Sequence, residues 1–389
     1  MTKAFDVTIV GAGLAGLQCA RHLARRGISV LLADRKIDLG RAVHTTGIFV
    51  RRTLEDFDLA PSLLGPPVRT VFLYSPRGRR QRLESPADEF RVGKMAALYG
   101  ELLREAIHAG AVWRPGAAFL GATASEGGSV IALEDGGRVE RVATRFLVGA
   151  DGARSRVAAT LGLSENEEFI VGAEEVLEGV PLDGPPALHC FLDPRLAPGY
   201  IGWVVHDGSR VHLGAGSADS FSPAAALVAM RRRGASLFDL SAARIVERRG
   251  GRIPVGGILP RISNRRGLLV GDAAGAVSPL TAGGLDGAMR LSRFAAEVLT
   301  AAVENDSPEI LALYSGAAFR ARFVSRRWMR RAISLVRSPC VVEAGCALLR
   351  SPALAPLAWH VFFGRGSFPE PDREPLRRAR AGDLAGVPS

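Results

Sequence analysis

The chain has 389 residues, of which 47% are hydrophobic and 23% charged, and its formal net charge is +11. These fractions are typical of a folded globular protein and exclude an intrinsically disordered or collagen-like chain. The length allows two or three structural units. The four cysteines form no Cys-x-x-Cys pair and no residue cluster has metal-ligand spacing, so we expect reduced thiols and no metal site.

The N-terminal residues predict a strand, a glycine turn, a helix and a second strand. Residues 5–10 form the first strand, and Gly11, Gly13 and Gly16 follow it in the spacing Gly-x-Gly-x-x-Gly. Gly11 permits a tight turn, Gly13 lets a pyrophosphate approach the backbone, and Gly16 lets helix and strand pack closely. Asp34 ends the second strand, where its carboxylate can accept hydrogen bonds from a ribose. The stretch therefore predicts a dinucleotide site.

The rest of the chain is read from apolar periodicity and turn residues. In chain order we expect a hairpin at 70–83, a helix at 92–109, short strands between 112 and 143, a buried strand at 145–150, a strand-rich stretch at 169–216, a helix at 223–233, a buried strand at 268–272, a helix at 284–302 and helices between 308 and 363.

Three of these stretches share one pattern, in which a buried strand leads into a glycine-rich turn. The first carries Gly11 to Gly16, the second ends at Asp151 and Gly152, and the third at Gly271 and Asp272. Ligands of doubly wound sheets lie beyond the carboxyl ends of the strands. We therefore expect the three turns to contact one long cofactor.

Two of these turns carry a family resemblance. Residues 147–155 (Leu-Val-Gly-Ala-Asp-Gly-Ala-Arg-Ser) resemble the second fingerprint of FAD enzymes with the para-hydroxybenzoate hydroxylase fold, and residues 271–275 with Pro279 resemble the third. The resemblance implies that Asp272 holds the flavin ribityl chain and that the loop 279–284 aims a helix N-terminus at the flavin pyrimidine ring. Lys94 occupies the place of a family arginine near the FAD phosphates, which keeps the charge and loses the planar fork. The residues expected to contact FAD are Gly11, Ala12, Gly13, Leu14, Ala15, Gly16, Asp34, Arg35, Arg41, Lys94, Asp151, Gly152, Gly271, Asp272, Pro279, Gly283 and Gly284.

Within that fold, the chain resembles the geranylgeranyl reductase family. Gly275 stands where aromatic hydroxylases usually have a histidine, and residues 250–257 and 198–205 resemble reductase segments. The second segment lines the isoprenoid tunnel in the family, and in this chain its Trp203 is in register. Ile201, Val205 and His206 replace the usual Tyr, Phe and Pro, and residues 44–47 (His-Thr-Thr-Gly) replace the region in which some archaeal members carry a cysteine.

The fold implied is α/β, with a Rossmann-like FAD-binding domain, an inserted antiparallel-sheet substrate domain and a C-terminal helical segment. The expected boundaries are 1–75, 92–165 and 265–307 for the FAD-binding domain, 76–91 and 166–264 for the substrate domain, 308–366 for the helical region, and 367–389 for a flexible tail.

The function implied is reduction of C=C bonds of an isoprenoid or similar hydrophobic substrate, by hydride transfer from flavin N5. Candidate proton donors are His44, Tyr200 and His206, and candidate substrate contacts are Trp203, Ile201 and Val205. Because the chain has no second dinucleotide motif, NAD(P)H binding transiently or a reduced redox protein would supply electrons. Two alternatives stay open: an FAD-dependent monooxygenase of an aromatic or polyketide-like molecule, and a non-catalytic flavoprotein that carries a lipid.

The basic residues concentrate in the C-terminal part. Residues 326–336 combine arginines with apolar residues, as an interfacial helix does, so peripheral membrane contact is an alternative to a helix pair packed on the FAD-binding domain. No nucleic-acid fold signature accompanies the arginines, so we expect no specific nucleic-acid partner. The first strand begins within ten residues and leaves no room for a signal peptide, which favours a cytoplasmic protein, with or without contact to the inner membrane face.

Overall fold

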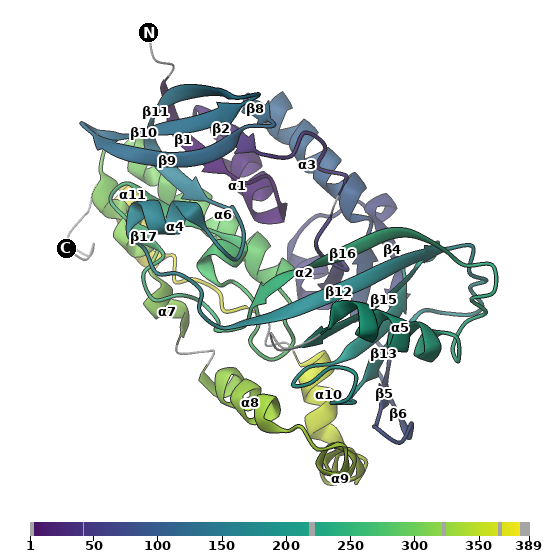
Figure 1. Ribbon diagram of the computed structural model, residues 1–389. Coiled ribbons are helices and arrows are strands. Elements are labelled where there is room, and N and C mark those ends of the chain that lie inside the picture. The colour runs from purple at the N-terminus through teal and green to yellow at the C-terminus, as the bar shows by residue number, and fades with distance from the viewer. Residues whose placement is uncertain (1–3, 42, 218–221, 321–323, 365–367, 382–389) are drawn as a thin grey trace.

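The strand that precedes the first glycine turn lies in the middle of an eight-stranded sheet (Figure 1). In spatial order its main path is β17 (Ser263–Asn264), β18 (Gly267–Leu269), β11 (Arg138–Gly149), β1 (Ala4–Val10), β2 (Val30–Asp34) and β8 (Val112–Pro115). The four central pairings from β18 to β8 are parallel. Strands β9 (Ala118–Ser125) and β10 (Gly128–Asp135) extend the sheet as antiparallel neighbours of β11. The computed structural model describes residues 4–41, 43–217, 222–320, 324–364 and 368–381.

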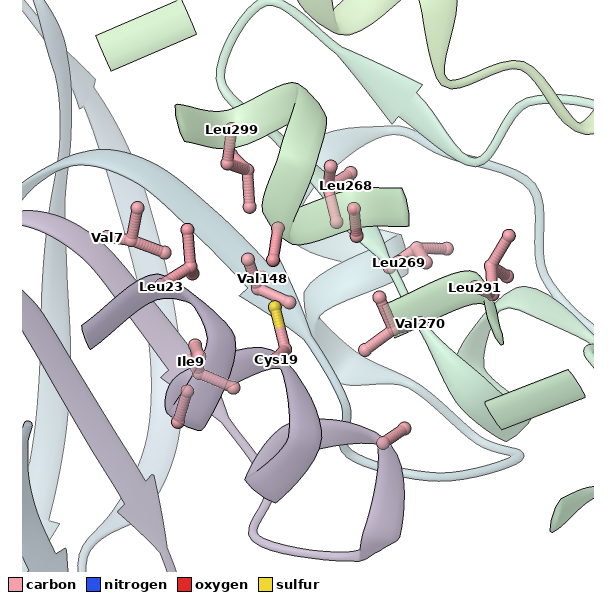
Figure 2. Close-up of a cluster of buried hydrophobic side chains, with 14 of the residues drawn as sticks. Val7, Ile9, Cys19, Leu23, Val148, Leu268, Leu269, Val270, Leu291 and Leu299 are labelled. Carbon is pink, nitrogen blue, oxygen red and sulfur yellow. The ribbon is translucent and has the colours of Figure 1, made fainter. Parts of the chain in front are cut away.

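Helix α1 (Leu14–Ala24) packs against β1 and β2 and lies between α3 (Met95–His108) and α6 (Leu285–Glu304), and all three helices share one core with this sheet. Figure 2 shows how Val7 and Ile9 of β1 meet Cys19 and Leu23 of α1, with Leu299 of α6 beside them. All five side chains are buried. Parallel strands covered on both faces need nearly continuous apolar sequence, which explains the apolar runs at 5–10 and 268–270.

A second, seven-stranded sheet is mainly antiparallel. Its spatial order is β16 (Arg244–Pro254), β12 (Phe169–Glu178), β15 (Val211–Ser217), β14 (Gly202–His206), β13 (Ala187–Phe191), β5 (Thr70–Tyr74) and β6 (Arg80–Glu84). Helix α5 (Pro223–Gly234) covers one face, where Met230 is buried against Gly202. The other face lies toward a three-stranded sheet of β3 (Ile48–Val50), β7 (Phe90–Gly93) and β4 (Leu64–Val68), with which it shares a core.

The C-terminal residues form short helices that return along both sheets. They are η3 (Pro308–Leu313), α7 (Gly316–Arg320), α8 (Val324–Leu335), α9 (Pro339–Leu349), α10 (Ala355–Phe363) and α11 (Glu374–Arg380). Helices α8 to α10 lie beside the seven-stranded sheet, and α11 packs on α6 (Figure 1). Among the described residues, no helix is both long and apolar enough to cross a membrane.

Three expectations from the sequence differ from the structure. The segment 92–109 is not one helix, because β7 continues to Gly93 and α3 begins at Met95. Strand β5 belongs to the seven-stranded sheet, so we propose to move the boundary of the substrate unit from 76 to about residue 70. Within the tail expected from 367 onward, α11 is packed through the buried Leu376 and Ala379, whereas residues 367 and 382–389 lie outside the described part.

Candidate functional site

A cavity of about 1200 Å³ runs between the two sheets. At one end it is lined by the three glycine-bearing turns, represented by Gly13, Gly152 and Gly271. The three turns are far apart in sequence and converge because β1, β11 and β18 are adjacent parallel strands. The three turns therefore line one cavity, which is the arrangement that a single long cofactor would need.

Close backbone contact explains the first turn. Gly11 has φ +105°, and a Cβ there would lie 2.2 Å from the carbonyl oxygen of Ala150 in the second turn. A Cβ at Gly16 would lie 1.9 Å from the carbonyl oxygen of Gly11. At Gly13, by contrast, no atom lies within 4 Å of such a Cβ. Gly11 and Gly16 are therefore required by packing, while Gly13 leaves open space at the N-terminus of α1.

The acid at the end of β2 stabilises this turn. Asp34 accepts hydrogen bonds from the backbone N–H groups of Ala12, at 2.7 Å, and Lys36, at 2.8 Å. Its side chain lines the cavity beside Ala12 and Arg35. A carboxylate with two oxygens keeps acceptor sites beyond these two bonds, so Asp34 can also accept from a ligand hydroxyl.

The second turn differs in part from the prediction. Gly152, Ala153 and Arg154 line the cavity, but Asp151 is not among the lining residues. Its carboxylate accepts from the hydroxyl of Ser155 and from the backbone N–H groups of Arg156 and Val157. Asp151 therefore stabilises the N-terminus of α4 (Arg156–Leu161), and its predicted contact with the cofactor is replaced by this capping role.

The third turn places a carboxylate in the wall of the cavity. Asp272 lies in the short 3-10 helix η2 (Gly271–Ala274), and burial raises its pKa to about 6. Among the described residues, no hydrogen bond from a protein group to its carboxylate is found, although its backbone carbonyl accepts from Asn166. A desolvated carboxylate that faces a cavity without a protein donor is suited to accept from ligand hydroxyls.

The N-terminus of α6 points into the same region. Gly283 and Gly284, just before this helix, line the cavity, whereas Pro279 is not among the lining residues. Unpaired N–H groups at a helix N-terminus favour negative charge.

The other end of the cavity is apolar. Its lining comes from the seven-stranded sheet and from α8 to α10, and includes Leu73, Leu188, Cys190, Val342, Leu349 and Phe362. Trp203 and Ile201 line it as well, as the sequence predicted for substrate contacts, while Val205 is buried beneath the wall in the adjoining core.

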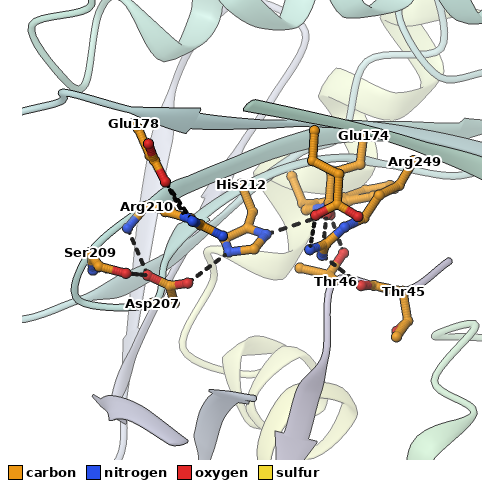
Figure 3. Close-up of polar contacts among 11 residues, drawn as sticks. Thr45, Thr46, Glu174, Glu178, Asp207, Ser209, Arg210, His212 and Arg249 are labelled. Carbon is orange, nitrogen blue, oxygen red and sulfur yellow. Dashed lines mark hydrogen bonds and ion pairs between the residues drawn. The ribbon is translucent and has the colours of Figure 1, made fainter. Parts of the chain in front are cut away.

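A buried charged network, which the sequence analysis missed, lies in the wall between the two ends. Figure 3 shows His212 between Asp207 and Glu174, with Arg249 and the Thr45–Thr46 loop on the far side of Glu174. His212 Nδ1 lies 3.3 Å from Glu174, and Nε2 lies 3.2 Å from Asp207. Hydrogen bonds and charge from both carboxylates raise the pKa of His212 to about 9 despite its burial, so the imidazole is protonated at neutral pH.

Comparison with known proteins reveals the family. Residues 9–70 match a family model described as an NAD(P)-binding Rossmann-like domain, and residues 94–207 match one described as an FAD binding domain. Digeranylgeranylglycerophospholipid reductase 1 of Methanopyrus kandleri is 32% identical over 332 residues, which cover 83% of this chain and 85% of that protein. The chain belongs to the geranylgeranyl reductase family.

Two more distant matches agree with this assignment. Geranylgeranyl diphosphate reductase of Rhodobacter capsulatus is 27% identical over 79% of this chain and 78% of that protein. A geranylgeranyl bacteriochlorophyll reductase-like protein from Thermoplasma acidophilum superposes with a TM-score of 0.79 at 20% identity, covering 99% of this chain and 98% of the other. The last match shows that the fold is shared.

The residues of this reductase family member fit FAD. Gly13 leaves room for a pyrophosphate at the N-terminus of α1, Asp34 faces the adjoining part of the cavity, and Asp272 offers an unpaired acceptor at the far side. These features suit a dinucleotide whose phosphates, ribose and ribityl chain lie along one groove. The chain is therefore an FAD-dependent oxidoreductase of the geranylgeranyl reductase type.

The other predicted residues of this reductase divide into those that line the cavity and those that do not. Arg35, His44 and Tyr200 line the cavity. Arg41 is 87% exposed beside Asp38, and the Lys94 ammonium donates to the carbonyl of Ser62, so neither reaches the cavity. His206 is buried on the opposite face of β14, edge-on to Phe238, and is no longer a candidate proton donor.

Proposed function

We propose that this reductase saturates C=C bonds of an isoprenoid chain. The observation that carries the proposal is the single cavity that joins the three glycine turns to an apolar end. An apolar channel of this kind favours a long hydrocarbon over a small polar substrate, because burial of apolar surface stabilises binding by about 25 cal/mol per Å². The names of the relatives, which are reductases of geranylgeranyl compounds, support the same substrate class.

FAD, when bound and reduced, supplies a hydride for this chemistry. Asp272 would hold the ribityl chain, and the N-terminus of α6 would favour negative charge on the ring system. The walls around the double bond would be mostly apolar, and the proton would come from a positioned side chain or from water.

His44 and Tyr200 are the candidate proton donors that remain. Burial and the Lys36 charge lower the pKa of His44, which favours the neutral imidazole. Burial raises the pKa of Tyr200, whose hydroxyl donates to the carbonyl of Thr281 at 2.5 Å. Because Tyr200 lines the cavity and lies against the loop that precedes α6, we propose it as the donor, with His44 as the second candidate.

We propose that NAD(P)H or a reduced redox protein delivers electrons at the surface, because the Gly-x-Gly-x-x-Gly motif at residues 11–16 would hold FAD and the sequence has no second such motif.

We further propose peripheral membrane contact through α8 to α10. In the described part of the chain, nine of the fifteen exposed large apolar side chains fall between Val324 and Trp359, with Trp328 at 65% and Leu335 at 81% exposure. Contiguous exposed apolar surface marks interaction sites. Several arginines of α8, unlike these exposed apolar residues, are turned toward the protein. Arg330, for example, donates to the carbonyl of Gly199. The apolar residues, more than the charges, therefore support this contact.

The test begins with the absorption spectrum of the purified protein and the mass of its released cofactor. The dithionite-reduced enzyme is then mixed anaerobically with a geranylgeranyl lipid. We expect a gain of two hydrogens per reduced double bond. A gain of one oxygen in the presence of air would identify a monooxygenase. If no lipid reoxidises the reduced flavin, the result would favour the alternative of a non-catalytic flavoprotein that carries a lipid.

A further inference from the structure

Glu174 is the most highly connected side chain of the buried network. It lies on β12, is 3% exposed and lines the cavity. Its carboxylate accepts from the Thr46 hydroxyl, from Trp203 Nε1 at 3.0 Å, and from Arg249 Nη1 at 3.2 Å, and it faces His212 Nδ1. A buried carboxylate is costly unless its acceptor sites are filled, and here four donors fill them.

The charges behind Glu174 alternate in sign. Asp207, His212, Glu174, Arg249 and Glu247 form a chain in which each cation lies between two anions. The Asp207 carboxylate is itself fixed by the backbone N–H groups of Ser209 and Arg210 (Figure 3). This arrangement holds Glu174 ionised and in one rotamer.

Glu174 also joins two parts of the molecule at the cavity wall. Thr45 and Thr46 belong to the loop before β3, whereas Trp203 and Arg249 belong to the seven-stranded sheet. Arg249 reinforces the link by donating to the carbonyl of Thr45 at 2.8 Å. Thr46, Glu174, Trp203 and Arg249 all line the cavity between the glycine turns and the apolar end.

The Trp203 ring is therefore held from two directions. Its Nε1 is tied to Glu174, and a Cβ at Gly214 on β15 would lie 2.4 Å from the ring, so only glycine allows the ring to rest there. An indole N–H that donates to a carboxylate has one fixed ring orientation, and the indole ring is the aromatic face that best stabilises positive charge.

We propose that Glu174 is a positioning residue that fixes Trp203 as the wall against which the reacting double bond lies. The inference rests on the proposed function. In the reduction, a hydride is added to one alkene carbon and a proton to the other, so the π bond is lost and two C–H bonds form. Transfer of the proton to one alkene carbon leaves positive charge on the other, which then receives the hydride, and the fixed indole face stabilises that charge.

The experiment compares Glu174→Gln with Glu175→Gln. Glu175 is the adjacent residue on β12, points to the opposite face, and is equally buried and paired with Arg231 and Arg248. Both variants are made in a holoprotein in which Trp113, Trp328 and Trp359 are replaced by Phe, so that Trp203 is the only tryptophan. Fluorescence anisotropy of Trp203 reports its rotation without any turnover.

We expect Glu174→Gln to lower the Trp203 anisotropy and to reduce kcat by about tenfold with little change in KM, because a misplaced reacting group mainly slows the chemical step. Glu175→Gln should leave both quantities near those of its parent. Anisotropy and kcat that match Glu175→Gln would overturn the proposal.

Two further measurements distinguish failure of this proposal from misfolding of the variant and from failure of the proposed function. If Glu174→Gln does not fold, Trp203→Phe, which loses only the N–H and part of the ring, should lower kcat by a similar factor, and an unchanged kcat would refute the role. If the parent reduces no geranylgeranyl lipid, the proposed function fails, while the anisotropy comparison still decides whether Glu174 positions Trp203.

Discussion

The Ala12 backbone N–H donates a 2.7 Å hydrogen bond to the carboxylate of Asp34, 22 residues later in the chain. This bond joins the first glycine turn to the end of the neighbouring strand β2. It gives the acid of the dinucleotide motif a structural task in addition to ligand binding. The shape of the turn therefore depends on the residue expected to bind the ribose.

Replacement of Asp34 by Ala should weaken FAD binding by about tenfold to a hundredfold, since hydrogen bonds to a charged acceptor contribute about 1.5–3 kcal/mol each. The variant loses its bonds to Ala12 and Lys36 together with any bond to the ligand. Dissociation is measured from the fluorescence of released flavin. Asp38→Ala is the control, because Asp38 is exposed and its carboxylate contacts neighbouring residues of its own loop, pairing with Arg41 and accepting from the Gly40 N–H; equal FAD affinity in the two variants would contradict the assignment.

Gly16→Ala should lower the stability of the fold, whereas Gly13→Ala should weaken FAD binding. A methyl at position 16 would lie 1.9 Å from the carbonyl oxygen of Gly11, so that variant should lose several kcal/mol of stability, as overpacked backbone contacts do. A methyl at position 13 meets no protein atom, so the apoprotein should keep its Tm. It should nevertheless bind FAD at least tenfold less well, because the methyl occupies the space left for the pyrophosphate. Thermal unfolding of apoprotein and flavin titration separate the two effects.

The glycine turns could be predicted from sequence because each is local. A buried strand, a glycine and an acid are consecutive residues, and the doubly wound fold brings the ends of such strands together. Asp151 shows the limit of that reasoning. An acid after a strand is also a helix cap, and the Ser155-Arg156-Val157 segment that follows is where its carboxylate is bound.

The charged network could not be predicted, because it depends on strand register. Glu174, His212 and Arg249 lie on three strands separated by up to 75 residues, and only the pairing of β12 with β15 and β16 brings them to one face. His206, in contrast, could have been excluded. The alternation of a strand places it on the face opposite to Trp203.

Arg290 should be a major determinant of stability. Its guanidinium is 1% exposed and binds Asp286 at 2.8 Å and Asp56 at 2.6 Å, and also Glu370 in the segment before α11. Arg290→Met would leave these carboxylates without their shared cation, at a cost of about 3–5 kcal/mol. Urea unfolding measures the loss, and faster hydrogen exchange in residues 368–381 should accompany it. Arg265→Met, which breaks an exposed pair with Glu309, should cost below about 1 kcal/mol; similar losses in both variants would refute this ranking.

Stability should fall as the pH rises from 6.5 to 9, because of His212. Asp207 and Glu174 face this imidazole directly, and Arg249 and Glu247 lie beyond Glu174. They raise the pKa of His212 from 6.5 to about 9 in the folded protein. A raised folded pKa gives a stabilisation that is complete below pH 6.5 and absent above pH 9, on the order of 3 kcal/mol.

The free energy of unfolding in urea, measured across this range, should show that slope in the parent and lose it in His212→Gln. His189→Gln should retain the slope, because burial lowers the pKa of His189 to about 4 and its titration lies outside the range. A slope that persists in His212→Gln would assign the pH dependence to another group.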